Sequence, residues 1–308
     1  SGEEGEVSGN IIAKNSLPLD RIIGINDIRN NQNILINGGF NINQRNKSSY
    51  TGGCTVDRWF LSSDTNAQLD VLDNGVRVTA KTSGTWTNLY TRLECIGLKH
   101  LDGQTLTLTF KLSKPSTKVK QIWALCNHSG SNTYFFSHMV NGESVSIVST
   151  TFTIDHIKSS EFMEFGIQLT SNAGDSIEIE WAKLELGNVT TPFVPRPYAE
   201  ELALCQRYYE CSNHIVRGLI GEGQSRLSHN VQYKQTKRIV PTLKVYGFNN
   251  EEGCVVGKIG SDINFPVTIY QNGVDGFGCI DISDSKGQSF VAGEIFEMNG
   301  WEADAEIY

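Results

Sequence analysis

The 308-residue sequence lacks any apolar run that approaches the ~20 residues of a membrane-spanning helix, and it also lacks any run of Lys or Arg. Its 34 acidic residues outnumber its 26 basic residues, which gives a net charge of -8. An acidic chain without a basic patch attracts a phosphate backbone poorly. These absences disfavour nucleic acid as a partner and predict no membrane insertion.

Recognisable catalytic and metal-binding motifs are absent as well. None of the six His residues stands in a His-Glu-x-x-His pattern, and neither a Gly-x-Ser-x-Gly motif nor a P-loop occurs. The segment from Gly218 to Gly223 superficially resembles a nucleotide-binding turn, but no helix or βαβ unit surrounds it. A glycosidase pair would lie on two separate strands and cannot be read from a β sequence. We predict a non-enzymatic protein with no cofactor and no metal site.

The seven cysteines are odd in number, form no Cys-x-x-Cys pair and have no His at ligand spacing. Most have small or apolar neighbours, which is typical of Cys as a small buried hydrophobe. We expect all seven cysteines to be free thiols, and we expect the protein to assemble in a reducing cytosol. They stand at positions 54, 95, 126, 205, 211, 254 and 279.

The sequence is rich in Gly, with 30 residues against seven Pro, and this favours short strands joined by tight turns. Residues 105–112 alternate Thr or Lys with apolar residues, which predicts a half-buried strand. Turn signals such as Asp73-Asn-Gly separate similar runs. We therefore predict an all-β fold with an antiparallel jelly-roll sandwich over residues 33–197. Its strands are expected at 34–36, 59–61, 68–72, 76–80, 89–93, 106–112, 121–126, 133–136, 144–152, 164–169 and 176–186.

Two further parts follow the sandwich. A short helical connector is predicted over residues 198–211, because Pro197 suits a first-turn position and Glu200 and Glu201 suit the positive N-terminal end of a helix. The strand pattern then resumes, which predicts a smaller C-terminal β domain over residues 212–308.

Residues 1–32 hold only short apolar pairs, at 11–12 and 22–23, that bury too little to fold alone. We interpret this segment as a stalk end or N-terminal extension, and the chain as a fragment of something longer. Self-association into a homotrimer would cover these pairs and protect strand edges. The competing interpretation is a monomer whose N-terminal segment folds back along the jelly roll.

Three linked motifs carry a family resemblance. Residues 34–45 contain Asn-Gly-Gly-Phe, residues 56–59 read Val-Asp-Arg-Trp, and residues 181–187 lead through a Pro-rich segment into a Cys-Gln-Arg-Tyr-Tyr run that ends at Tyr209. Together they resemble the carbohydrate-binding-module-like jelly roll of bacteriophage tail fibres and other tail-tip proteins. Residues 237–242 and 301–306 also resemble C-terminal modules of phage fibres.

The resemblance implies a non-catalytic phage or phage-like tail fibre protein that binds a bacterial surface polysaccharide, or glycan, for host attachment. It implies a place in the virion tail after assembly in the bacterial host cytoplasm, with upstream tail or baseplate proteins as partners and a threefold fibre. Two alternatives stay open. One is a structural spacer or baseplate-attached tail component without receptor contact, and the other is a tail-associated glycan depolymerase.

Candidate glycan-binding residues follow from sugar chemistry, because sugars stack their C–H faces on aromatic rings and hydrogen-bond planar amides. Polar neighbours of Trp86 indicate an exposed ring in the middle of the jelly roll. The loop between Tyr270 and Phe277 offers a second surface, although a plain hairpin turn explains it equally well. The predicted set is Trp86, Asn88, Tyr90, Tyr134, Tyr270 and Asn272.

Other aromatic residues are predicted to be structural. The apolar neighbours of Trp123 favour burial over binding, and Trp59 is expected in the core behind an ion pair formed at Asp57 and Arg58. Modules of the resembled family often present an Asp or a structural calcium near the last strand. Here residues 176–186 alternate Glu with Ile and Trp181, which is typical of a solvated strand face and not of a calcium site.

Overall fold

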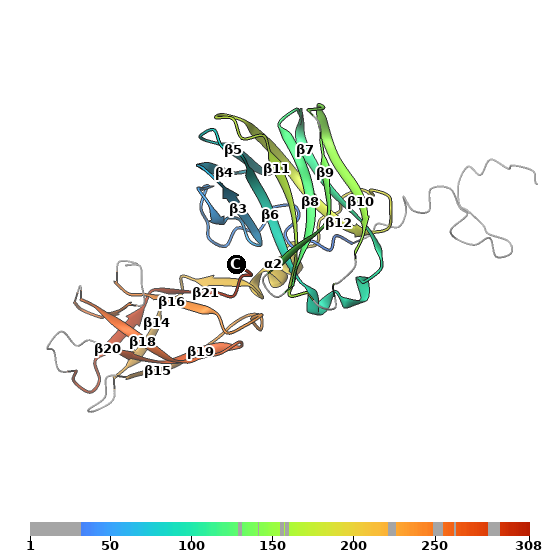
Figure 1. Cartoon of the computed structure of the whole chain (residues 1–308). Helices are drawn as coiled ribbons and strands as arrows, with labels where there is room; N and C mark the ends of the chain where they lie inside the picture. Colours follow the sequence, from blue (N-terminus) through green and yellow to red (C-terminus); the bar gives the residue numbers. More distant parts are fainter. Residues whose placement is uncertain are drawn as a thin grey trace, which may run out of the picture.

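The computed structural model describes residues 32–128, 131–140, 142–154, 157, 160–220, 226–248, 255–261, 263–282 and 290–308. Within these ranges the side chains of residues 128, 131–136, 226–229, 255, 270 and 279–281 are not described. The segment expected to form a stalk end lies outside the described residues, apart from residue 32. Figure 1 shows a larger β sandwich above a smaller β domain, with helix α2 (Tyr198–Gln206) between them. The predicted fold class is confirmed.

The sandwich consists of two six-stranded antiparallel sheets. The first sheet has the order β1-β4-β5-β12-β7-β10, with β1 (Ser49–Tyr50), β4 (Ala67–Leu72), β5 (Gly75–Ala80), β7 (Thr105–Ser116), β10 (Val145–Thr153) and β12 (Ser176–Leu186). The second sheet has the order β2-β3-β6-β11-β8-β9, with β2 (Gly53–Cys54), β3 (Trp59–Ser63), β6 (Thr87–Glu94), β8 (Val119–His128), β9 (Ser131–Met139) and β11 (Phe162–Leu169).

The hydrophobic core lies between these sheets and follows the alternation of the sequence. In β7 the side chains of Leu106, Leu108, Phe110 and Leu112 are fully buried and belong to one cluster. Each such side chain contributes about 1.5–3 kcal/mol when it leaves water. Trp59 also belongs to this cluster, as predicted, and its indole N–H donates to a backbone carbonyl.

The expected strand at 34–36 is wrong, because residues 35–39 form turns. Asn37 and Phe40 have positive φ angles of 56° and 59°, which end an extended conformation. Asn37 donates from Nδ2 to the carbonyls of Ile42 and Asp57, at 2.8 Å each. A Cβ on Gly38 would lie 2.4 Å from the carbonyl oxygen of Ala182, so this turn packs too closely against β12 for any larger residue.

A β-bulge in β12 changes the alternation that the sequence predicts. Ile179 pairs with Leu112 and Trp181 pairs with the next residue of β7, Lys111, so the register shifts between them. Ala182 and Leu184 therefore face the core, while Trp181 lies on the outer face and stacks on Phe193 with ring centroids 5.2 Å apart. Trp181 does not share a face with Ile179, contrary to the simple period of two.

The C-terminal domain contains a three-stranded sheet, β13-β21-β16, and a six-stranded sheet, β14-β20-β17-β18-β19-β15. Strand β13 begins at Tyr209, inside the range predicted for the connector, because it pairs with β21. The bounds are β13 (Tyr209–Ser212), β14 (Val216–Leu219), β15 (Arg226–Gln232), β16 (Thr242–Tyr246), β17 (Val255–Lys258), β18 (Asn264–Asn272), β19 (Gly276–Ile282), β20 (Ile295–Met298) and β21 (Gly300–Asp304).

Buried charges join the two domains. Arg58 is buried, pairs with Glu306 and lies over the ring of Tyr208 at 3.5 Å from the centroid. Asp57 is buried beside Arg45, at 3.8 Å, and burial raises the pKa of its carboxyl to about 6. The sequence suggested one ion pair at Asp57 and Arg58, whereas in the structure Asp57 pairs with Arg45 and Arg58 pairs with Glu306. The Arg58–Glu306 pair joins the sandwich to the C-terminal domain, and removal of either partner would leave an uncompensated buried charge.

The thiols at positions 54, 95, 126, 205 and 211 are free, which confirms the prediction for these five. Burial raises the pKa of Cys54 and of Cys95 to about 12, so both stay protonated at neutral pH. Residue 254 and the side chain of residue 279 lie outside the described residues.

Candidate functional site

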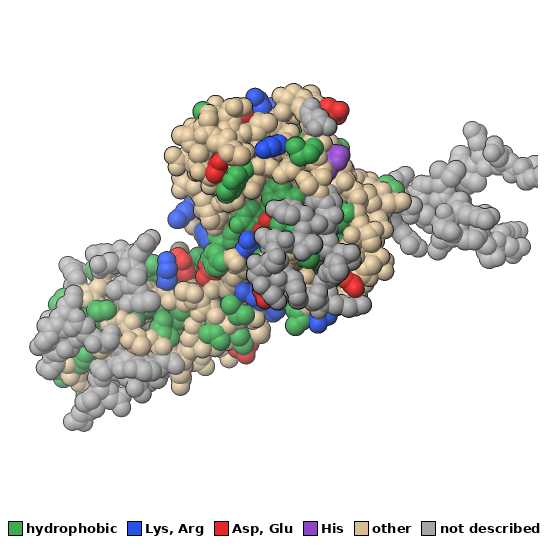
Figure 2. All heavy atoms as spheres, viewed as in Figure 1, with side chains coloured by type: hydrophobic (Ala, Val, Ile, Leu, Met, Phe, Trp, Pro, Cys, Tyr) green, Lys and Arg blue, Asp and Glu red, His purple; other side chains and the backbone are tan. Residues whose placement is uncertain are grey.

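The outer face of the second sheet carries an aromatic row. Strand pairing places Phe60 beside Tyr90, Tyr90 beside Gly166, and Gly166 beside Trp123. The neighbours of these residues along each strand belong to the core cluster, so the row itself faces outward. In the view of Figure 2, hydrophobic side chains gather in a hollow over β6, β11 and β8.

Gly166 explains how Trp123 lies on this face. A Cβ at Gly166 would come within 2.2 Å of the Trp123 ring, so the indole occupies the space that a side chain would take. The indole N–H donates to Glu164 at 3.3 Å, and Glu164 pairs with Arg92 at 2.9 Å. Trp123 is only 4% exposed, as the sequence predicted, but it is buried against the outer face and not within the core cluster.

Beside this row lies a cavity of about 310 Å³. Strand pairing brings Asn88, Gln168 and Gln121 side by side across three strands. Gln121 donates to Gln168 at 2.5 Å and accepts from Ser137 at 2.7 Å. The cavity is lined by Thr85, Trp86, Asn88, Lys120, Gln121, Trp123, Glu164 and Gln168.

A short loop holds Trp86 at the rim of the cavity. Asp64 accepts hydrogen bonds from the backbone N–H groups of Thr85 and Trp86, at 2.7 and 3.2 Å. The bond from Thr85 holds the pKa of the Asp64 carboxyl below its usual 3.8. A Cβ on Gly84 would lie 2.4 Å from Asp64, so this approach needs a glycine. The backbone at Trp86 is therefore held by Asp64, and the Trp86 side chain is half-buried.

The cavity contains an unused hydrogen-bond acceptor. Oδ1 of Asn88 is buried and has no hydrogen-bond partner among the residues that the structure describes. An acceptor that is buried without a partner costs about 1–3 kcal/mol, so a donor from a ligand would be favourable here. Glu164, the carboxylate that lines the cavity, is already paired with Arg92, and Lys120 is held by the carbonyl of Thr85 at 3.4 Å.

The predicted site residues have separate positions in the structure. Trp86 and Asn88 line this cavity together, whereas Tyr90 stacks on Phe60 with ring centroids 5.4 Å apart. Burial raises the pKa of Tyr90. Asn272 lies in the C-terminal domain, where its side chain donates to Pro241 and accepts from Tyr233. The side chains of residues 134 and 270 lie outside the described residues.

Sequence reasoning missed Gln121, Gln168, Glu164 and the seat at Gly166. One signal was available, because Gly166 interrupts an alternating strand at an outward position and so marks a close approach. Groups of three or more His, Cys, Asp or Glu able to hold a metal do not occur among the described residues. No helix in the described part of the chain is long and apolar enough to cross a membrane.

No family model and no curated protein match the sequence. Among solved structures, the chain is similar to a CBM4 structure, with a TM-score of 0.33 and 18% identity over 49% of this chain and 98% of that one. It is similar to the xylan-binding module CBM15, with a TM-score of 0.31 and 13% identity over 46% and 98%. It is also similar to bacteriophage CBA120 tailspike protein 4, in its enzymatically active domain, with a TM-score of 0.30 and 13% identity over 50% of this chain and 21% of that one.

Proposed function

We propose that the chain is a glycan-binding protein that holds its ligand on the outer face of the second sheet. The observation that carries this proposal is the half-buried ring of Trp86, on a backbone held by Asp64, beside a row of amides, Asn88, Gln168 and Gln121. Such a ring stacks against the C–H face of a sugar, and planar amides pair with its hydroxyl groups. The unpartnered Oδ1 of Asn88 would accept one of these hydroxyls.

We further propose that binding is non-catalytic and serves host attachment by a phage or phage-like tail fibre in the virion tail. The linked sequence motifs at 34–45, 56–59 and 181–209 support the tail-fibre part of this proposal. The cavity supports the non-catalytic part, because Glu164 is the one carboxylate among the described residues that line it and is paired with Arg92. Acid–base cleavage of a glycoside uses two carboxyl groups.

Trp86→Ala tests the binding site on an array of bacterial surface glycans. Loss of a well-placed aromatic contact should weaken affinity by roughly 1–3 kcal/mol while the melting temperature stays nearly unchanged. Tyr198→Ala is the matched control, because this ring is 64% exposed and lies on helix α2, away from the cavity. Equal binding by the wild type and Trp86→Ala, or a large loss of stability in Trp86→Ala, would contradict the proposal.

The tail-fibre proposal includes a homotrimer and is tested by light scattering. The intact chain should give a mass near three times 34.1 kDa, and a version that starts at Asn33 should assemble more weakly. A monomer at every concentration would count against the fibre. Release of reducing sugars from host envelope by the purified chain would instead favour a depolymerase.

A further inference from the structure

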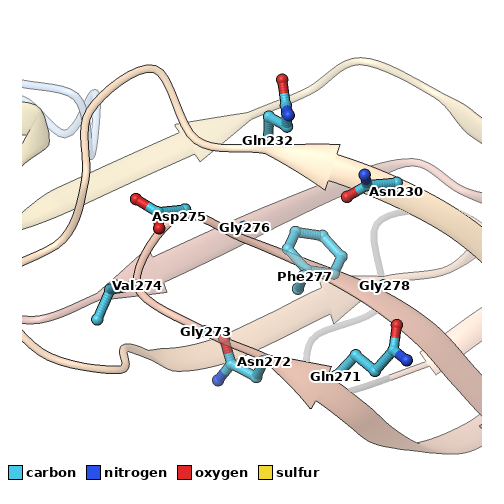
Figure 3. Close-up of a pocket in the computed structure, with 10 residues that line it drawn as sticks. All are labelled: Asn230, Gln232, Gln271, Asn272, Gly273, Val274, Asp275, Gly276, Phe277 and Gly278. Atoms are coloured by element: carbon cyan, nitrogen blue, oxygen red, sulfur yellow. The ribbon is translucent and has the colours of Figure 1, made fainter.

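An open groove of about 570 Å³ lies in the C-terminal domain, on the sheet formed by β15, β19 and β18. Strand pairing sets its shape. Gly278 of β19 lies between Asn230 of β15 and Gln271 of β18, and Gly276 lies beside Gln232. Since adjacent strands are about 4.8 Å apart, the two walls stand roughly 10 Å from each other. The floor between them consists of Gly276, Gly278 and the buried Phe277. Figure 3 shows Asn230 and Gln232 on one side of the glycine strand and Gln271 on the other.

The wall residues have free polar groups. The side chains of Asn230, Gln232 and Gln271 are exposed, and none of them forms a hydrogen bond or ion pair with the described residues. Each primary amide offers two donors and a carbonyl acceptor. By contrast, two other residues of the groove are hydrogen-bonded within the domain. Asn272 donates to the carbonyl of Pro241 at 2.7 Å, and Asp275 accepts from the hydroxyl of Thr236 at 2.6 Å.

This chemistry selects the class of ligand. Asp275 is the charged residue among those described that line the groove, and its carboxylate disfavours an anion. No cluster of carboxylates that could hold a metal cation occurs among the described residues. Strand β19 is paired on both sides, so an extended peptide could not add to it as a further strand. Free amides on both walls suit a flat ligand with many hydroxyl groups and no charge.

We propose that this groove is a second binding site, for an uncharged oligosaccharide, in addition to the outer face of the second sheet. The two sites lie in different domains and share no residue. Recognition here depends on hydrogen bonds from Asn230, Gln232 and Gln271. The groove does not depend on the ring of Trp86, so each site can be removed while the other stays intact.

The test uses the full chain in four forms on an array that carries both uncharged and acidic oligosaccharides. These are the wild type, Trp86→Ala, the double variant Gln232→Met with Gln271→Met, and the combination of all three substitutions. Met keeps the length of Gln and removes its hydrogen bonds. Gln235→Met is the control, since Gln235 is exposed in the same domain and does not line the groove.

We expect Trp86→Ala to retain binding to at least one uncharged oligosaccharide, and the double variant to weaken that binding at least tenfold, which corresponds to about 1.4 kcal/mol. If Trp86→Ala alone abolishes all glycan binding, the second site is excluded and the proposed function stands. If only the double variant loses binding, the groove stands and the outer face is excluded. The second site is also overturned if the wild type binds no uncharged oligosaccharide on the array. A peptide array is measured in parallel, and the second site is overturned if the double variant loses binding to peptides and keeps its binding to oligosaccharides.

Discussion

The two outer faces of the jelly-roll sandwich carry polar side chains in similar positions but have different surroundings. On the first sheet, Lys183 and Glu185 of β12 are almost fully buried beneath the segment that follows the strand. Lys183 contacts Glu185 at 3.1 Å and donates to the Thr191 hydroxyl at 2.6 Å. On the second sheet, Oδ1 of Asn88 has no hydrogen-bond partner within the described part of the chain.

The difference shows how a polar face becomes part of the fold or remains available to a ligand. Residues 187–193 supply the partners of the first face, since the N–H of Thr191 donates to Glu185 and the carbonyl of Pro192 accepts from Lys183. Trp181 and Phe193 fasten the same segment by stacking. The cavity of the second face has no such cover from the described residues. Its hydrogen-bonding capacity is therefore left for another molecule.

Glu185→Ala should cause the largest loss of stability, on the outer face of the first sheet that residues 187–193 cover, which we call the covered face. It leaves the Lys183 ammonium buried without its carboxylate, which costs about 3–5 kcal/mol. Urea unfolding measures this loss. Glu178→Ala is the matched control on the same strand, because Glu178 pairs with Arg77 at the surface and such pairs contribute at most about 1 kcal/mol. Similar losses in both variants would mean that residues 187–193 do not seal this face.

Gly166→Ala should cause a smaller loss of stability, on the outer face of the second sheet that carries the cavity, which we call the open face. The added Cβ would meet the Trp123 ring at 2.2 Å, and overpacking of this kind costs about 1–3 kcal/mol. Glycan affinity should fall as well, because the displaced ring lines the cavity. The control is Gly97→Ala, where a Cβ meets no atom within 4 Å and stability should change little. An unchanged melting temperature in Gly166→Ala would show that the Trp123 ring does not occupy the space above Gly166.

The sequence predicted what depends on local alternation. Leu106 to Leu112 of β7 show the period of two, and the core-facing side follows from it. The expectation of a half-buried strand is wrong on the other side, because Thr107 and Thr109 are also buried. The bulge before Trp181 could not be predicted, because it depends on pairing with a strand far along the chain. The Asn-Gly-Gly sequence at Asn37 does signal a turn, but it stands at the end of an expected strand that the structure lacks. The burial of Trp123 was predicted, but its face was not, since only the pairing with Gly166 reveals it. Of the predicted site residues, Trp86 and Asn88, which are two residues apart in one segment, line one cavity, and their role in glycan binding stays a prediction.

The hydrogen bonds by which Asp64 holds the loop at Trp86 should be lost in acid. The pKa of Asp64 is depressed in the folded chain, so the stabilisation it gives is complete above its usual pKa of 3.8 and is lost as the pH falls through the lower folded value. Protonation would release the N–H groups of Thr85 and Trp86. Retention on a glycan column should therefore decline below pH 3.8, and Asp64→Ala should be weak at every pH. A wild type that binds equally well in strong acid would show that another contact fixes the loop.

The smallest effects are expected when a single hydroxyl group is removed from each face. On the covered face, Thr190 bonds to Ser149 at 2.7 Å and to Thr109 at 3.1 Å, so Thr190→Val should cost about 0.5–1.5 kcal/mol of stability. On the open face, Ser137 donates to Gln121 at 2.7 Å from an exposed position, so Ser137→Ala should change stability by less than about 0.5 kcal/mol. Ser137→Ala should nevertheless weaken glycan binding, because Gln121 loses one of the two hydrogen bonds that orient its amide, whereas Thr190→Val should leave binding unchanged. Paired unfolding and array measurements on the two variants decide this, and the reverse pattern would mean that the covered face is the one that contacts the ligand.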